Sequence, residues 1–397
     1  MLNGRGLARL AGALGLVLVL AACGAEPEVA EAPAGETTPA ATETPDASDA
    51  SDDDDGDTDE ADDGDQADVE AEDPGPHVVS TVAPLADIVA QVMDGRGEVT
   101  GLIPEGMDSH TYEPRPGDVA PLTEADAFIG NGLALNEAAV QLAEANLPED
   151  APLVLLGEET LDDAALSDEH WHSHDDGHSH DHDHDHDHGH SHDHDHDDGH
   201  SHDDSDEAAT DGQVNPHVWT SVPNMMRYTE RIAEVLTELD PDGAEHYDAA
   251  VQSYLDELEQ LDAAIRDAVE TVPDERRRLV VYHDAWAYFG EEYGVEVIAA
   301  VQPSDFSEPS ASDVRAIIDQ VRDHDVPALF GSEEFPSDVV EVIADETGAA
   351  YVGDLADDQL PGEPGDAAHS YVGMMATNTA TVVDHLGGDA EALAAFR

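Results

Sequence analysis

The stretch YDAAVQSYLDELEQLDAAIRDAV, from Tyr247 to Val269, decides the fold. Its large apolar residues recur at spacings of three and four with carboxylates between them, which predicts one amphipathic helix of about seven turns. The helix is expected to end near Pro273 and to lie within residues 241–272. Its apolar residues are Tyr247, Val251, Tyr254, Leu258, Leu261, Ile265 and Val269.

On both sides of this helix, predicted strands alternate with predicted helices. Before it, HVVSTVAPLADIVAQVMDG begins at His77 with a β-branched strand and continues at helical spacing; further strands are expected at 98–103, 127–129 and 152–156, and a helix at 133–144. After it, LVVYH, VEVIAAV, PALFGS and AAYVGDL read as strands with helices between them. The sequence therefore predicts an α/β fold: two lobes of mostly parallel sheet with flanking helices, at 77–240 and 273–397, joined by one long rigid helix across a cleft.

The N-terminal residues read as an export signal. Residues 1–23 contain Arg5 and Arg9, a short apolar run and the sequence LAAC, which resembles a bacterial lipobox and predicts lipidation of Cys23. Cys23 is the only cysteine, so an intrachain disulfide is excluded. Residues 24–76 are rich in Asp, Glu, Thr, Pro and Gly and are expected to form a disordered acidic tether.

The chain is strongly acidic, with 94 Asp and Glu against 13 Arg, no lysine and a formal net charge of −81. This charge excludes electrostatic attraction to nucleic acid or to an anionic membrane surface. Part of it lies in the tether and in the histidine-rich loop described next, but the folded portion is acidic too. We hypothesise a host that lives with high salt, where screening relieves self-repulsion; a melting temperature that failed to rise with NaCl would contradict this.

A histidine-rich segment, HWHSHDDGHSHDHDHDHDHGHSHDHDHDDGHSH at 170–202, holds 15 of the 23 histidines. It lies in a loop at 168–212 that is expected to stay solvated, because no burial would offset the entropy of ordering it. Imidazole and carboxylate together indicate transition-metal binding. The histidines are His170, His172, His174, His178, His180, His182, His184, His186, His188, His190, His192, His194, His196, His200 and His202.

Three further histidines stand where predicted strands end or helices begin. His110 lies in the loop PEGMDSHTYEP, His217 in the polar turn NPHVW, and His283 in VVYHDAW. The carboxyl ends of strands are where open α/β sheets bind ligands, although one loop histidine alone is more often a surface residue. Trp286, Tyr288 and Phe289 after His283 are expected to pack in the core.

Four segments in order resemble the zinc and manganese solute-binding proteins of bacterial ABC importers, over residues of about 77–390. They are GMDSHTYEPRPGDVAPLTEADAFIGNGLALNE, NPHVW, VVYHDAWAYFGEEYG with LFGSEEFPSDVVEVIADETG, and DDQLPG with SYVGMMATN. The resemblance implies two α/β lobes joined by a rigid helix, with one metal at their interface and two ligands from each lobe. Carried over, the ligands are His110 and His217 from the first lobe, and His283 and an acidic residue from the second.

For the acidic ligand we favour Asp358, which precedes Leu360 by two residues, as the resemblance implies. Asp354 and Asp357 remain open, because the inserted-looking PGEPGDAAH makes the local match uncertain. His369 is expected to be a surface residue or to lie just outside the site. The remaining histidines, which we expect to be structural or exposed, are His77, His246, His324 and His385.

The types of the predicted ligands favour zinc over manganese. Relatives that look manganese-selective tend to carry a carboxylate at the position of His283, whereas three imidazoles and one carboxylate suit tetrahedral Zn²⁺. Zinc relatives also often carry a His/Asp/Glu-rich insertion between the first two ligand motifs, where this chain has its own.

The sequence therefore predicts an extracytoplasmic lipoprotein that captures Zn²⁺ and presents it to an ABC permease driven by its ATPase. We expect a monomer, held at the membrane only through the lipid on Cys23, with the histidine-rich loop as a weak collector. The alternatives are a stand-alone zinc buffer or adhesin, and a manganese-binding member of the same family. A zinc hydrolase is disfavoured, because no HExxH occurs and four protein ligands would leave no position for water.

Overall fold

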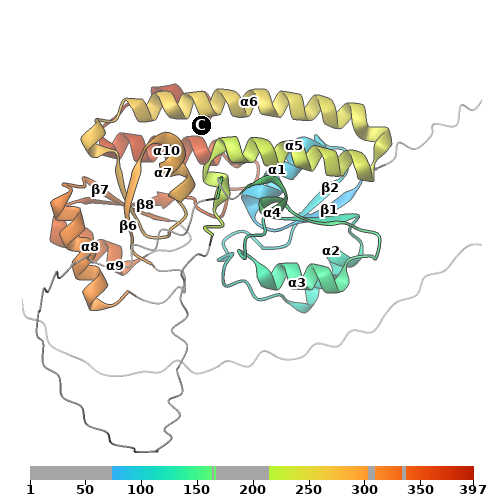
Figure 1. The fold of residues 1–397 in the computed structure, drawn as a ribbon, viewed down its shortest axis with the longest axis horizontal. Helices are drawn as coiled ribbons and strands as arrows, with labels where there is room; N and C mark the ends of the chain where they lie inside the picture. Colours follow the sequence, from blue (N-terminus) through green and yellow to red (C-terminus); the bar gives the residue numbers. More distant parts are fainter. Residues whose placement is uncertain (1–73, 163–164, 167–213, 303–308, 333–336) are drawn as a thin grey trace, which may run out of the picture. The chain divides into compact units, whose positions relative to one another are not determined.

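The long helix α6 (Ala244–Glu270) organises the chain, as predicted, with 27 residues. In the computed structural model, Tyr247, Leu258 and Leu261 are fully buried along one of its faces. The helix packs against α1 (Ala83–Met93) and α5 (Val222–Leu239) of the first lobe, and against α7 (Ala287–Tyr293) and α10 (Tyr371–Leu386) of the second. Figure 1 shows α6 running past both sheets.

The structure describes residues 74–162, 165–166, 214–302, 309–332 and 337–397. These residues belong to one compact unit. The signal sequence with Cys23, most of the acidic tether and all fifteen histidines of the histidine-rich loop lie outside the described residues. Among the helices that the structure does describe, none combines the length and apolar character needed to cross a membrane.

The first lobe contains a parallel sheet with the strand order β2-β1-β3-β4. Its central strand β3 is buried along its whole length, as expected when helices cover both faces. The strands are β1 (His77–Ser80), β2 (Glu98–Gly101), β3 (Ala127–Gly130) and β4 (Leu153–Leu155). The other helices of this lobe are α2 (Val119–Thr123), α3 (Glu137–Asn146) and α4 (Leu156–Thr160).

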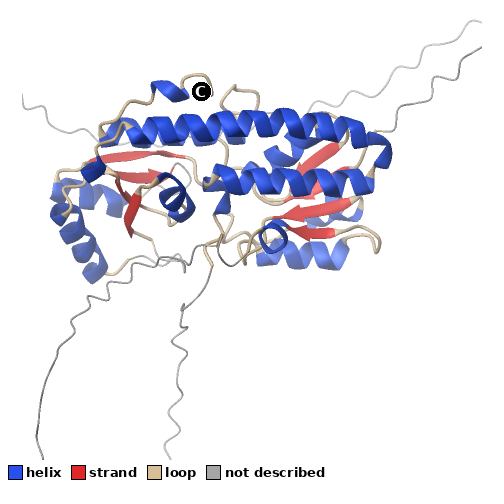
Figure 2. Ribbon diagram, turned by 45° about the horizontal axis from the view of Figure 1, so that its top comes forward, coloured by secondary structure: helices blue, strands red, loops and turns tan. Residues whose placement is uncertain are grey.

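The second lobe repeats the arrangement with the order β6-β5-β7-β8, again all parallel. Helices flank the sheet in each lobe (Figure 2). The strands are β5 (Arg278–Val281), β6 (Glu296–Ala300), β7 (Ala328–Ser332) and β8 (Ala350–Leu355). The remaining helices are α8 (Ala311–Asp323) and α9 (Asp338–Thr347). The predicted two-lobe α/β fold is thus confirmed.

One continuous apolar core serves both lobes. It joins Phe128 of the first sheet, Leu258 of α6 and Phe330 of the second sheet. A smaller cluster around Val280 and Leu329 belongs to the second lobe alone. Because α6 packs against helices of both lobes and α10 also contacts α1 of the first lobe, this core fastens the two lobes together.

Two expected boundaries differ clearly from the structure. The helix expected at 133–144 begins only at Glu137, because Gly132, Leu133 and Ala134 have positive φ angles of 77°, 54° and 59°, which a right-handed helix excludes. The strand expected at 98–103 ends at Gly101. Trp286, the residue before α7, is buried in the core as predicted.

Candidate metal centre

His110 is presented by a tight turn in the loop that follows β2. The carboxylate of Asp108 accepts hydrogen bonds from the His110 backbone N–H at 2.9 Å and from the Thr111 hydroxyl at 2.7 Å. Asn136, just before α3, donates from Nδ2 to the carbonyl of Ser109 at 2.6 Å. The short polar side chain of Asp108 thus shapes the turn, and Asn136 ties it to the body of the lobe.

His217 is held by Asn215, two residues earlier. The Oδ1 atom of Asn215 accepts from the His217 backbone N–H at 3.0 Å and lies 2.8 Å from the ring Nδ1. Since an amide oxygen only accepts, Nδ1 carries the proton and Nε2 keeps its lone pair. Asn215 also donates from Nδ2 to the carbonyl of Asp284, and its own carbonyl accepts from the Tyr288 hydroxyl, so the second lobe helps to place a residue of the first.

His283 and Asp358 come from the second lobe, His283 two residues after β5 and Asp358 three residues after β8. Ser109 of the first lobe donates its hydroxyl to Asp358 Oδ2 at 2.5 Å. In the described part of the chain no hydrogen bond reaches Asp358 Oδ1. The second lobe therefore contributes a buried carboxylate, and its Oδ1 atom has lone pairs that could coordinate a cation.

The four predicted ligands lie together, with one ligand atom of each within 4.8 Å of the others. The Nε2 atoms of His110 and His217 are 2.9 Å apart. Asp358 Oδ2 lies 3.7 Å from His110 Nε2, and its Oδ1 lies 3.8 Å from His217 Nε2. The ring of His283 stands edge-on to the other two imidazoles, with centroid separations of 5.1 Å and 4.6 Å. The arrangement converges on one point.

Burial and charge act differently on the four groups. Burial, together with the charge of His283, holds the pKa values of His110 and His217 well below the usual range, so both are neutral. Burial also lowers the pKa of His283, but the carboxylates of Asp357, Asp358 and Asp284 outweigh it and raise that pKa to about 9. Burial raises the pKa of Asp358 to about 6, against the opposing effects of His283 and Ser109.

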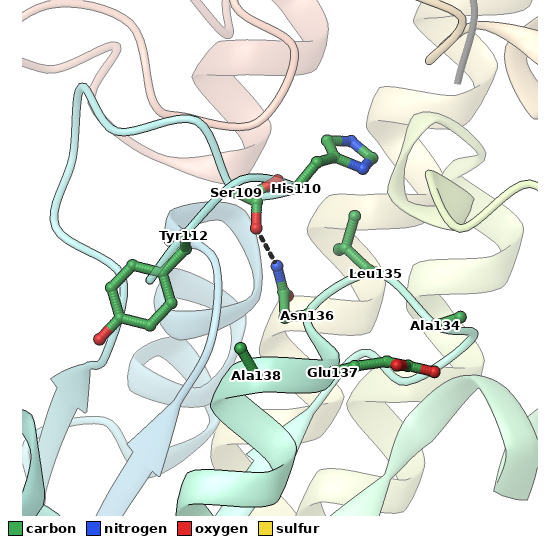
Figure 3. Close-up of a pocket in the computed structure, with 8 residues that line it drawn as sticks. All are labelled: Ser109, His110, Tyr112, Ala134, Leu135, Asn136, Glu137 and Ala138. Carbon is green, nitrogen blue, oxygen red and sulfur yellow. Dashed lines mark hydrogen bonds between the residues drawn. The ribbon is translucent and has the colours of Figure 1, made fainter. Parts of the chain in front are cut away.

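His110 is the cluster member that faces solvent. Its side chain is 14% exposed, against 4% for His217 and 3% for Asp358. A pocket of about 340 Å³ adjoins it, lined by the His110 turn and by the start of α3 with Asn136 and Glu137. Figure 3 shows the imidazole at one edge of this pocket and the Asn136 bond to Ser109 beneath it. His110 is therefore the member of the cluster that borders this pocket.

The other candidates lie outside the cluster. Asp354 is exposed on β8, and His369 pairs across the lobes with Glu105 at 3.2 Å. Asp357 is buried, but it binds Trp286 and does not belong to the four. His77 Nε2 lies near the Thr100 hydroxyl, and His246 Nε2 near the Met93 carbonyl. The two remaining histidines, His324 and His385, lie at the ends of α8 and α10.

Sequence reasoning missed the groups that orient the ligands, chiefly Asn215, Ser109 and Asn136. A signal for Asn215 was present: an amide two residues before His217 in NPHVW can bond both to the backbone and to the ring of that histidine. No signal identified Ser109 or Asn136 as partners, because their contacts join segments 27 and 249 residues apart.

Comparison with known proteins agrees with this geometry. Residues 78–385 match the family described as "ZnuA: Zinc-uptake complex component A periplasmic". The chain is 29% identical over 312 residues to the manganese-binding lipoprotein MntA of Halalkalibacterium halodurans, covering 79% of this chain and 89% of the relative. It is 29% identical over 318 residues to the zinc-binding protein TroA of Treponema pallidum, again covering 79% and 89%.

The solved structure of the periplasmic zinc-binding protein TroA from Treponema pallidum has the same fold. It aligns with a TM-score of 0.63 and 28% identity, covering 79% of this chain and 99% of that one. The family match spans well over half of the sequence. The chain therefore belongs to the ZnuA family of metal-binding substrate-binding proteins of ABC importers, which are transport proteins and not enzymes.

Proposed function

We propose that this protein captures Zn²⁺ outside the cytoplasm, with His110, His217, His283 and Asp358 as ligands, and delivers it to the permease of a zinc importer. The observation that carries the proposal is the convergence of three imidazoles and one carboxylate within 4.8 Å. Four protein ligands of this type are typical of closed tetrahedral zinc sites. Such a site holds a cargo ion without leaving a position open for hydrolytic chemistry.

The spacing of the donor atoms supports a small tetrahedral ion. Two donors at about 2.0–2.1 Å from zinc lie about 3.3–3.4 Å apart in tetrahedral geometry. The separations of 2.9, 3.7 and 3.8 Å between donors of His110, His217 and Asp358 bracket this value, so small side-chain shifts suffice for binding. Manganese prefers more oxygen ligands and a higher coordination number than this set supplies.

The proposal extends to the N-terminal regions. A lipid on Cys23 would hold the protein at the outer face of the membrane, and the acidic tether would let the folded part reach a permease. The fifteen histidines of the histidine-rich loop would raise the local zinc concentration beside the His110 pocket. We expect the importer to comprise that permease and its ATPase, and the binding protein to act as a monomer.

Zinc stoichiometry tests the proposal directly. Calorimetry on the mature chain should find one tight site and several weak ones. The variant His110→Ala/His217→Ala/His283→Ala should lose the tight site, and a variant lacking 170–202 should keep it. The matched control is His77→Ala/His324→Ala/His385→Ala, which removes three imidazoles outside the cluster. A tight site that disappears with 170–202 would overturn the assignment.

Manganese transport is the second candidate, because a manganese-binding relative and a zinc-binding relative are equally similar at 29% identity. Metal uptake decides between them. Deleting the gene should slow growth in zinc-depleted medium, and zinc rather than manganese should restore it. The reverse pattern would favour manganese. Equal growth of wild-type and deletion strains in both depleted media would favour a stand-alone buffer or adhesin.

A further inference from the structure

A second buried carboxylate stands beside the proposed site. Asp357 is 3% exposed, next to Asp358 in the loop after β8. A buried carboxylate is unfavourable unless neighbouring groups compensate for its lost hydration. In the part of the chain that the structure describes, no arginine forms an ion pair with Asp357, and its carboxylate faces Trp286 and His283 instead.

Two indoles from the two lobes hold Asp357 in place. Trp286 donates from Nε1 to Asp357 Oδ1 at 3.0 Å, and Trp219 donates from Nε1 to the Asp357 backbone carbonyl at 2.8 Å. The ring of Trp219 also stands edge-on to His217, with centroids 5.2 Å apart. The backbone and one carboxylate oxygen are therefore fixed, which leaves Oδ2 facing a defined direction.

That direction is His283. Asp357 Oδ2 lies 3.6 Å from His283 Nδ1, an ion-pair distance that a small shift of either side chain would shorten to a hydrogen bond. His217 has a corresponding partner, but there the acceptor facing Nδ1 is the neutral amide of Asn215 at 2.8 Å. The two imidazoles are thus oriented by acceptors of different charge.

We propose that Asp357 is a positioning residue that holds His283 with Nδ1 protonated and Nε2 directed at the metal, and thereby favours zinc over manganese. A ligating imidazole whose far N–H donates to a carboxylate is a more basic ligand. Zinc gains more from a stronger imidazole than manganese, which prefers oxygen donors. This inference rests on the proposed function, because it requires the four ligands to bind one ion.

Asp357→Asn tests the inference, since the amide can still accept from Trp286 while the charge facing His283 is lost. The matched control is Asp354→Asn, the same charge change on an exposed residue of β8. In the full-length mature chain with one equivalent of metal and a competing chelator, Asp357→Asn should weaken zinc binding about ten- to hundredfold. The ratio of zinc to manganese affinity should fall about tenfold or more, and Asp354→Asn should match the wild type.

A double-mutant cycle separates positioning from structural support. In a His283→Ala background, adding Asp357→Asn should change zinc affinity less than about twofold, because Asp357 acts through His283. An equal loss in both backgrounds, or an equal loss for zinc and manganese, would overturn the inference. If the wild type lacks a tight site that His283→Ala removes, the proposed function fails; if that site exists and Asp357→Asn binds like the wild type, the inference alone fails.

Discussion

The two halves of the proposed site differ in charge. The first lobe contributes His110 and His217, whose pKa values lie well below the usual range and which are neutral. The second lobe contributes His283, whose pKa is raised to about 9, beside Asp358 and Asp357. In the metal-free protein the proton on His283 balances carboxylate charge that a bound cation would balance instead. The second lobe therefore supplies the charge that attracts the ion, and the first supplies neutral donors.

The largest effect should come from removing charge on the second lobe. Asp358→Asn deletes both a ligand and the negative charge, so we expect zinc affinity to fall by more than the roughly hundredfold that loss of an outer partner costs. His110→Ala should cost less, because His110 is the most exposed of the four and water can take its place. Chelator competition measures both affinities. A greater loss of zinc affinity for His110→Ala than for Asp358→Asn would contradict the proposed difference between the two lobes.

Zinc binding should release a proton from the second lobe. Because the pKa of His283 is raised to about 9, the ring is protonated at pH 7.5 and must lose its proton to bind metal. Affinity should therefore rise with pH up to about 9 and then level off. Calorimetry in buffers of different ionisation enthalpy should find about one proton released by the wild type and by His110→Ala, but none by His283→Ala. Equal proton release by the wild type and both variants would refute the assignment of this proton to His283.

The neutral half should respond more weakly to loss of its orienting group. Asn215→Ala removes the acceptor that holds Nδ1 of His217 and leaves every charge in place. We expect about a tenfold loss of zinc affinity and no change in the proton release. Asn146→Ala, at the end of α3 and away from the site, serves as the control. A change in proton release with Asn215→Ala would show that the orientation of His217 also affects the charge of the second lobe.

The smallest effect should come from a contact between the lobes outside the site. Asp87 on α1 accepts at Oδ2 from the Tyr371 backbone N–H at the start of α10, at 2.8 Å. Asp87→Ala should lower stability by about 1 kcal/mol, as for loss of a helix cap. Zinc affinity should stay within about twofold of the wild type. Denaturant melts of the metal-free and zinc-loaded forms measure both, and a large affinity loss would mean that this contact also shapes the site.

Local patterns predicted the fold and placed the three histidines in loops next to strands and helices, whereas the ligand role of these histidines came from the resemblance to the family. Apolar spacing marks α6, and strand-to-helix boundaries locate the loops of His110 and His283. The resemblance favoured Asp358 but left Asp354 and Asp357 open, because in a short loop successive side chains point in different directions that the hydrophobic pattern does not record. Nor did the sequence place the start of α3, since left-handed φ angles at Leu133 and Ala134 are unusual for these residues.

The partners of the ligands were beyond sequence reasoning for a related reason. Ser109 meets Asp358, and Trp219 meets Asp357, only because α6 and the shared core bring the two lobes together. Contacts of such long sequence separation depend on the packing of the lobes, which periodicity and residue type do not specify.

Anomalous diffraction at the zinc edge, from crystals of the protein loaded with one equivalent of zinc, tests the shared metal site most directly. We expect one strong peak among His110, His217, His283 and Asp358, with each donor at about 2.0–2.2 Å and two ligands from each lobe. A peak bound by one lobe alone, or the absence of a peak between these four side chains, would contradict the proposed shared site.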